Sequence, residues 1–131
     1  MSDDVGLFGR WSWNDGRTEI MAFTDIDASL SFGASAKGRR WGRPDDTVGL
    51  ATAINGLSAD HRDFLAAGGL GPLIGDGALP HPGPEKILEA YYTVAIEAWK
   101  LTFDYQFVTN PAYNRDRGPV SIAATRLHTQ F

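Results

Sequence analysis

The chain has 131 residues, of which 43% are hydrophobic and 21% charged, so it has the length and composition of one folded domain. Its formal net charge is -4 and its 12 Lys and Arg are scattered, which argues against nucleic acid as a partner. The absence of cysteine excludes disulfides, zinc–thiolate sites and a cysteine nucleophile. No apolar run reaches the roughly 18 residues of a membrane-spanning helix, and the N-terminus has no apolar signal-peptide core.

Alternation of apolar and polar side chains with a period of two predicts six β-strands. In chain order they are 5–13, 26–37, 48–55, 85–96, 99–107 and 123–131. The pattern is clearest in 99–107, where Trp99, Phe103 and Phe107 share one face while Lys100 and Asp104 share the other. A helix would place these charges on every side, so this stretch is predicted to be a strand.

The segment 85–96 also fits a helix. Pro84 suits the first helical position, and Ile87, Leu88 and Tyr91 would form a helical stripe. We favour a strand because the segment is rich in β-branched and aromatic residues. A tight turn at 97–98 would then pair it with the next strand.

The connections between the expected strands differ in length. Segments 14–25 and 58–83 are long, 38–45 is shorter, 97–98 is minimal and 110–117 is moderate. One short helix is expected at 59–67, with Ser58 as its N-cap and Gly68 as the C′ residue. Long loops on one side and short turns on the other are typical of outer-membrane barrels.

These features predict an all-β fold: an antiparallel up-and-down meander that forms part of a transmembrane β-barrel. The apolar face would contact lipid, with Trp13, Trp99, Phe107 and Phe131 near the strand ends, where an interfacial aromatic girdle belongs. An ordinary half-buried sheet has the same alternation and is the alternative. The polar residues expected to face the pore and bind substrate are Arg10, Asp27, Lys37, Glu89, Tyr91, Lys100, Asp104, Gln106, Arg126 and His128.

The sequence has no clear motif for catalysis, for cofactor binding or for metal binding. Gly69, Gly71 and Gly75 do not have phosphate-loop spacing, and Pro72 interrupts them. We therefore expect no catalytic residue and no metal site. The candidate metal ligands that lack a recognised spacing are His61, Asp63, Asp76 and His81.

Two short motifs are the most distinctive: Gly42-Arg43-Pro44-Asp45-Asp46 and Asn110-Pro111-Ala112-Tyr113-Asn114. With others along the chain, they resemble the C-terminal part of the carbohydrate-selective porin (OprB) family. The further matching stretches are Trp13-Asn14-Asp15-Gly16, Lys37-Gly38, Val48-Gly49-Leu50-Ala51, Arg117-Gly118-Pro119-Val120, and Arg126-Leu127-His128 with the terminal Phe131.

The resemblance implies a channel, not an enzyme, that passes sugars through the outer membrane of a Gram-negative bacterium without a cofactor. Family members are much longer, and about six strands are too few for a membrane barrel, so residues 1–131 are expected to be a C-terminal fragment. Expected partners are sugars, outer-membrane lipid, the remaining N-terminal strands, and the barrel-assembly machinery through Phe131. Segments 58–83 and 110–117 would be external, and 38–45 and 97–98 periplasmic.

Two other functions stay open from the sequence. A soluble β-module could bind glycans with the same polar face. A small hydrolase could use Glu89 and Asp104 as a carboxylate pair. A requirement for detergent separates the porin from both.

Overall fold

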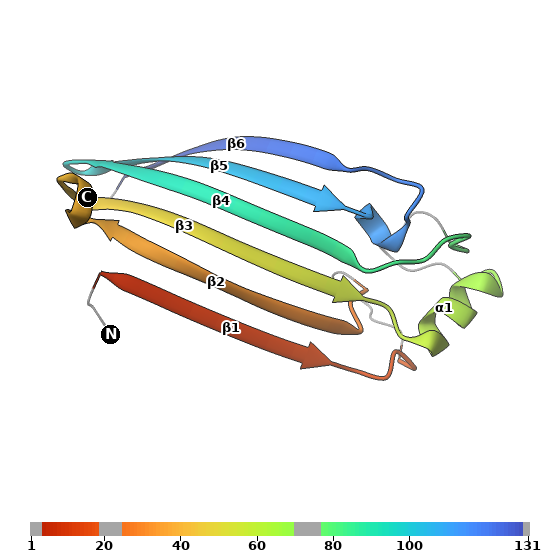
Figure 1. The fold of residues 1–131 in the computed structure, drawn as a ribbon. Coiled ribbons are helices and arrows are strands. Elements are labelled where there is room, and N and C mark those ends of the chain that lie inside the picture. Colours follow the sequence, from red (N-terminus) through yellow and green to blue (C-terminus); the bar gives the residue numbers. More distant parts are fainter. Residues whose placement is uncertain (1–3, 19–24, 70–76, 130–131) are drawn as a thin grey trace.

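The computed structural model of the chain describes residues 4–18, 25–69 and 77–129 and contains one antiparallel sheet with the strand order β1-β2-β3-β4-β5-β6 (Figure 1). One short helix, α1, and two 3-10 turns lie between strands. The predicted meander with one loop helix is therefore confirmed. The elements are β1 Val5–Trp13, β2 Ala28–Gly38, η1 Arg39–Trp41, β3 Arg43–Gly56, α1 Ala59–Ala66, β4 Glu85–Ile96, β5 Trp99–Thr109, η2 Pro111–Tyr113 and β6 Val120–Thr129.

The ambiguous segment 85–96 is a strand. It pairs with β3 on one side and with β5 on the other, so the backbone groups of β4 are used in two ladders. The helical alternative is therefore wrong. The turn after β4 has its first residue, Glu97, at φ 52°.

The connection between β2 and β3 is shorter than predicted. The expected loop 38–45 contracts to η1 and Gly42, and β3 begins at Arg43, which pairs with Gly38. The register then shifts, because Lys37 pairs with Thr47 and the intervening residues of β3 bulge. Pro44, which made this segment look like a loop, lies in that bulge and has no ladder partner that needs its N–H.

The predicted short helix is confirmed. Ser58 caps its first turn by accepting a hydrogen bond from the His61 N–H at 3.0 Å. Gly68 follows the C-cap at φ 99°, a conformation that glycine adopts without steric cost. None of the helices in the described residues is long and apolar enough to cross a membrane.

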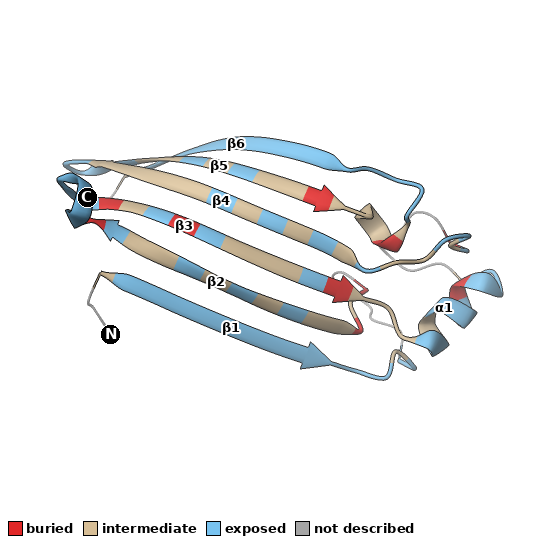
Figure 2. Cartoon of the chain, viewed as in Figure 1, coloured by how far each residue is buried: buried red, intermediate tan, exposed pale blue. Residues whose placement is uncertain are grey.

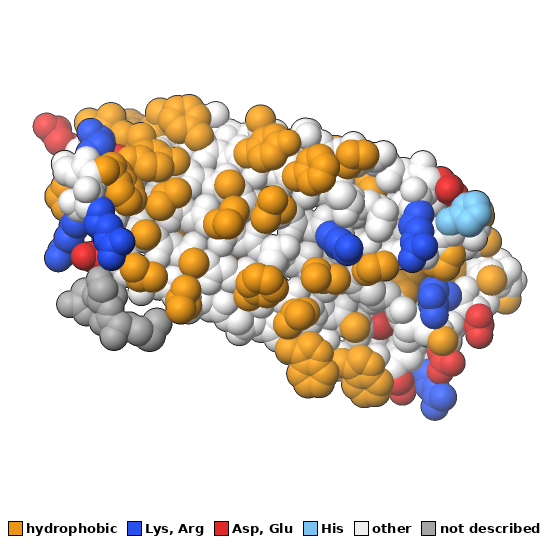
Figure 3. All heavy atoms as spheres, viewed as in Figure 1, with side chains coloured by type: hydrophobic (Ala, Val, Ile, Leu, Met, Phe, Trp, Pro, Cys, Tyr) orange, Lys and Arg blue, Asp and Glu red, His pale blue; other side chains and the backbone are white. Residues whose placement is uncertain are grey.

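The apolar face of the sheet is more exposed than the polar face. Figure 2 shows that few residues of the strands are buried. Leu50, Phe103 and Leu127 are 55%, 51% and 64% exposed. Within the described residues the buried hydrophobic side chains are Leu65, Val108 and Tyr113, of which Val108 alone belongs to the sheet. Figure 3 shows hydrophobic side chains along much of the sheet, with charged groups gathered mainly towards its ends. Such a surface is far more apolar than that of a typical monomer in water.

A buried carboxylate fastens the turn end of the sheet. Asp46 is 1% exposed and accepts hydrogen bonds from the guanidinium of Arg43, the hydroxyl of Tyr92 at 2.7 Å and the N–H of Ala95 at 2.9 Å. Trp41 Nε1 donates to the same hydroxyl at 2.9 Å. The motif that begins at Gly42 therefore joins β3 to β4 and holds the η1 turn against them.

A second polar cluster fastens the loop end. The hydroxyl of Tyr113 donates to the carbonyl of Asp25 at 2.7 Å, and the carboxylate of Glu85 accepts from the N–H of Ala112 at 3.0 Å. These bonds link the loop after β1, the start of β4 and the loop after β5. The motif that begins at Asn110 thus supplies the buried Tyr113 that connects loops far apart in the sequence.

Candidate functional site

Strand register arranges the polar side chains in rows across β4, β5 and β6. Adjacent strands lie about 4.8 Å apart, and alternate residues along a strand about 6.8 Å apart, so each row is close to the next. Each row joins one residue of β4 or β5 to its partner on the neighbouring strand. The pairs are Glu89–Gln106, Tyr91–Asp104, Thr93–Thr102, Thr102–Arg126 and Lys100–His128.

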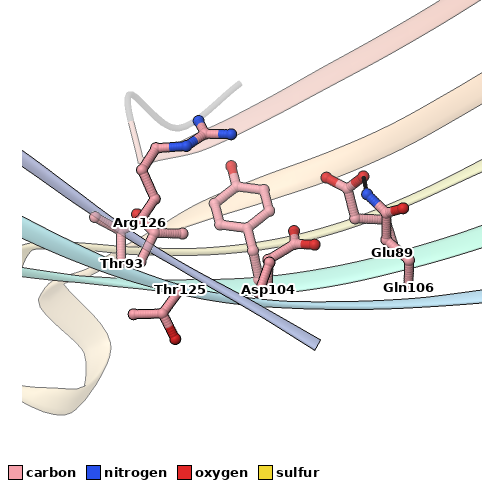
Figure 4. A pocket seen from close by; sticks show the side chains of 9 residues that line it. Glu89, Thr93, Asp104, Gln106, Thr125 and Arg126 are labelled. Atoms are coloured by element: carbon pink, nitrogen blue, oxygen red, sulfur yellow. Dashed lines mark hydrogen bonds between the residues drawn. The ribbon is translucent and has the colours of Figure 1, made fainter. Parts of the chain in front are cut away.

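These rows enclose a hollow on the polar face, which we call the loop-side hollow (Figure 4). It has a volume of about 580 Å³. In Figure 4, Asp104, Glu89 and Arg126 rise from one side of the sheet, whereas Thr125 points to the other side. The lining residues are Glu89, Tyr91, Thr93, Thr102, Asp104, Gln106, Ala124, Thr125 and Arg126.

A second hollow of about 340 Å³ adjoins the first towards the turns, and we call it the turn-side hollow. Tyr91, Thr93, Thr102 and Arg126 line both hollows, so the two are continuous. The residues of the turn-side hollow are Lys37, Asp45, Thr47, Tyr91, Thr93, Lys100, Thr102, Arg126 and His128.

The ring of Tyr91 lies across the backbone of its cross-strand partner, Gly49. A Cβ at Gly49 would come within 2.2 Å of the ring's Cε1 and 2.4 Å of its Cζ. Glycine therefore leaves the space that the ring occupies. The result is an aromatic surface at the junction of the two hollows.

Some polar groups around Tyr91 already pair with each other. Gln106 Nε2 donates to Glu89 at 2.9 Å, and the hydroxyls of Thr93 and Thr102 lie 2.8 Å apart. Within the part of the chain that the structure describes, the side chains of Asp104 and Arg126 form no such bond. Carboxylate, guanidinium and amide groups therefore surround the ring, and together they can both accept and donate hydrogen bonds.

Eight of the ten predicted site residues come together in the two hollows: Lys37, Glu89, Tyr91, Lys100, Asp104, Gln106, Arg126 and His128. Arg10 lies on the edge strand β1, opposite Ser31, and lines neither hollow. Asp27 precedes β2 and is 3% exposed, because its carboxylate accepts from the N–H of Ser58 at 2.7 Å and contacts His61. Asp27 therefore stabilises a loop and does not reach the polar face.

Sequence reasoning missed six lining residues, Ala124 and Thr125 among them, and the glycine under the ring. Asp45, Thr47, Thr93 and Thr102 line the hollows, and Gly49 makes room for the tyrosine ring. Thr93 and Thr102 could have been found from the period of two, because they lie on the same face as Tyr91 and Asp104. The importance of Gly49 depends on which residue faces it across the ladder, which the sequence alone does not show.

His61 and His81, two of the candidate metal ligands, lie beside different carboxylates. His61 Nδ1 lies 3.0 Å from Asp27, whereas His81 Nδ1 lies 3.0 Å from Asp116. Among the residues that the structure describes, no group of three or more His, Asp or Glu could hold a metal ion. Several residues considered from the sequence lie outside the described residues: Gly71, Pro72, Gly75, Asp76, Gln130 and Phe131.

The loop end carries one strongly perturbed group outside the strands. Burial, with the charges of Glu85, Asp27 and Asp25 nearby, raises the pKa of Tyr113 above its usual value of 10.0. The neutral phenol is therefore the form that the folded loops favour.

The family described as "Carbohydrate-selective porin, OprB family" matches residues 1–131, the whole chain. No curated protein and no solved structure matches the chain.

Proposed function

Since the chain belongs to the carbohydrate-selective porin (OprB) family, we propose that its polar face lines a water-filled passage by which sugars cross the outer membrane of a Gram-negative bacterium. OprB porins are outer-membrane channels and not enzymes. Movement through such a channel is facilitated diffusion, in which no bond is made or broken. The site therefore has to bind a sugar weakly and release it on the other side.

The aromatic surface of Tyr91 carries this proposal. A pyranose ring has apolar C–H faces that pack on an aromatic ring, and an equatorial rim of hydroxyls that donate and accept hydrogen bonds. Tyr91 supplies the packing contact, and the neighbouring Asp104 and Arg126 supply hydrogen bonds to the hydroxyls. Glu89 and Gln106 extend the hydrogen-bonding edge towards the loops.

The apolar face suits contact with lipid. Its exposed side chains include Phe103 in the middle of β5 and Trp99 at the strand's turn end, where an interfacial aromatic belongs. The loop end, with 58–83 and 110–117, would face outside and the 97–98 turn would face the periplasm. A soluble glycan-binding module is not favoured, because this face would then be exposed to water.

The sheet needs further strands to work in a membrane. In the described residues β1 and β6 are its edges, and unpaired edge groups are costly in hydrocarbon. Closure of a membrane barrel takes about eight strands or more. We propose that residues 1–131 are the C-terminal segment of a larger barrel, which is inserted by assembly machinery that recognises Phe131. We call this larger protein the assembled barrel.

The experiment is glucose titration of the ion current through the assembled barrel, extracted in detergent from outer membranes and placed in a planar bilayer. A bound sugar obstructs the ions, so the current should fall with glucose and saturate. The variant Tyr91→Ala should need more glucose for half-block. A current that glucose never alters would contradict the proposal.

A further inference from the structure

Charge on the polar face is divided between its two ends. The loop-side hollow carries the carboxylates of Glu89 and Asp104, with Arg126 at its boundary. The turn-side hollow carries three basic side chains, which are Lys37, Lys100 and Arg126. His128 adds a fourth basic group there, opposed by one carboxylate, that of Asp45.

The cations of the turn-side hollow are available to a ligand. In the described part of the chain, the side chains of Lys37, Lys100 and Arg126 form neither an ion pair nor a hydrogen bond. All three are exposed and lie on one continuous face. Like charges gathered on one wall repel each other, and in a narrow passage they produce a positive potential that draws anions in.

The position of Arg126 relates these cations to the sugar site. Arg126 lies opposite Thr102, one row from the pair of Tyr91 and Asp104. Two residues along a strand span about 6.8 Å, a distance comparable with one sugar ring. A sugar packed on Tyr91 therefore has one end at the guanidinium of Arg126, which can form two parallel hydrogen bonds to a carboxylate or phosphate.

We propose, on the basis of the proposed porin function, that the turn-side hollow recognises anionic sugars that carry a carboxylate or a phosphate. The sugar ring packs on Tyr91, and its anionic group faces Arg126 with Lys100 behind it. The anion then leaves over Lys37 and His128 towards the turns. The carboxylates of the loop-side hollow bind hydroxyls of neutral and anionic sugars alike.

Solute flux into liposomes that contain the assembled barrel tests this. The probes are glucose, glucuronate, glucose 6-phosphate and the cationic glucosamine. We expect glucuronate or glucose 6-phosphate to enter faster than glucosamine. Arg126→Gln should lower the ratio of anionic-sugar flux to glucose flux about two- to fivefold, the factor of an exposed ion pair. Lys86→Gln, which removes a cation from the opposite, apolar face of β4, is the control and should leave the ratio unchanged.

Each result separates this inference from the proposed function. An effect of Arg126→Gln on glucuronate, on glucose 6-phosphate or on both supports the inference and identifies the anionic group. Normal glucose flux with an unchanged anion ratio in Arg126→Gln overturns the inference and leaves the porin function standing. A barrel that passes none of the four probes overturns both.

Discussion

The ring of Tyr91 covers the Cα of Gly49, and a Cβ there would lie 2.2 Å from the ring's Cε1. Gly49→Ala should therefore push the ring away from its present position while the barrel still assembles, since a single side chain can move aside. Glucose block of the current should weaken by about 0.5 to 1.5 kcal/mol, the worth of an aromatic packing contact. The control is Gly9→Ala, where a Cβ meets nothing within 4 Å.

A double variant shows whether Gly49→Ala weakens glucose block by displacing the Tyr91 ring. In a Tyr91→Ala background, Gly49→Ala should change glucose block no further, because the contact is already gone. Equal losses in both backgrounds would mean that Gly49 acts on something other than Tyr91.

The buried carboxylate of Asp46 is expected to stabilise the turn end. Asp46→Asn replaces one acceptor oxygen by a donor. An amide nitrogen in place of Oδ2 removes the acceptor of the Tyr92 hydroxyl, and one in place of Oδ1 removes the acceptor of the Ala95 N–H; either change also removes an acceptor of the Arg43 guanidinium. The midpoint of urea unfolding of the assembled barrel should fall clearly below that of the wild type. Asp45→Asn, at the exposed neighbouring position, should cause a much smaller change. Equal midpoints for the two variants would show that the Asp46 cluster does not fasten the sheet.

Alkaline pH should loosen the loop end through Tyr113. Its pKa is raised in the folded state, so its contribution to stability is complete below pH 10.0, the usual pKa, and is lost as pH rises towards the folded value. Urea unfolding between pH 8 and pH 12 should show stability falling above about pH 10. Tyr113→Phe should reduce that slope, whereas Tyr105→Phe, at an exposed tyrosine, should keep it. Identical slopes in both variants would exclude Tyr113 as the group responsible.

Neighbouring residues of β5 should respond oppositely to a charge. Phe103 lies on the apolar face, where Arg costs about 2 to 4 kcal/mol near the bilayer centre. Phe103→Arg should therefore prevent assembly in the outer membrane, whereas Thr102→Arg should assemble and alter conductance. The measurement is the amount of folded barrel in outer-membrane fractions. Normal assembly of Phe103→Arg would place that face away from lipid.

The sequence predicted the strands well because alternation follows directly from strand geometry. The sequence could not predict the register of the strands, because the register depends on how the turns align separate strands. It is the register that places Gly49 opposite Tyr91 and Thr102 opposite Arg126. The position of Asp27 could not be predicted either. Alternation assigned Asp27 to the polar face, but its carboxylate contacts Ser58 and His61 at the start of the loop helix and is buried there. The alternating pattern therefore predicts which face a residue occupies when it lies inside a strand. For a residue at the end of a strand, tertiary contacts decide where the side chain lies.

The most direct test of a sugar passage over the polar face is the reactivity of Thr102→Cys in the assembled barrel. A charged thiol reagent added to the water should react with this cysteine and reduce the current, and glucose should slow the reaction by occupying the hollow that residue 102 lines. Leu101→Cys, on the apolar face of the same strand, should not react. A Leu101→Cys that reacts while Thr102→Cys does not, or labelling of Thr102→Cys that glucose never slows, would contradict this account.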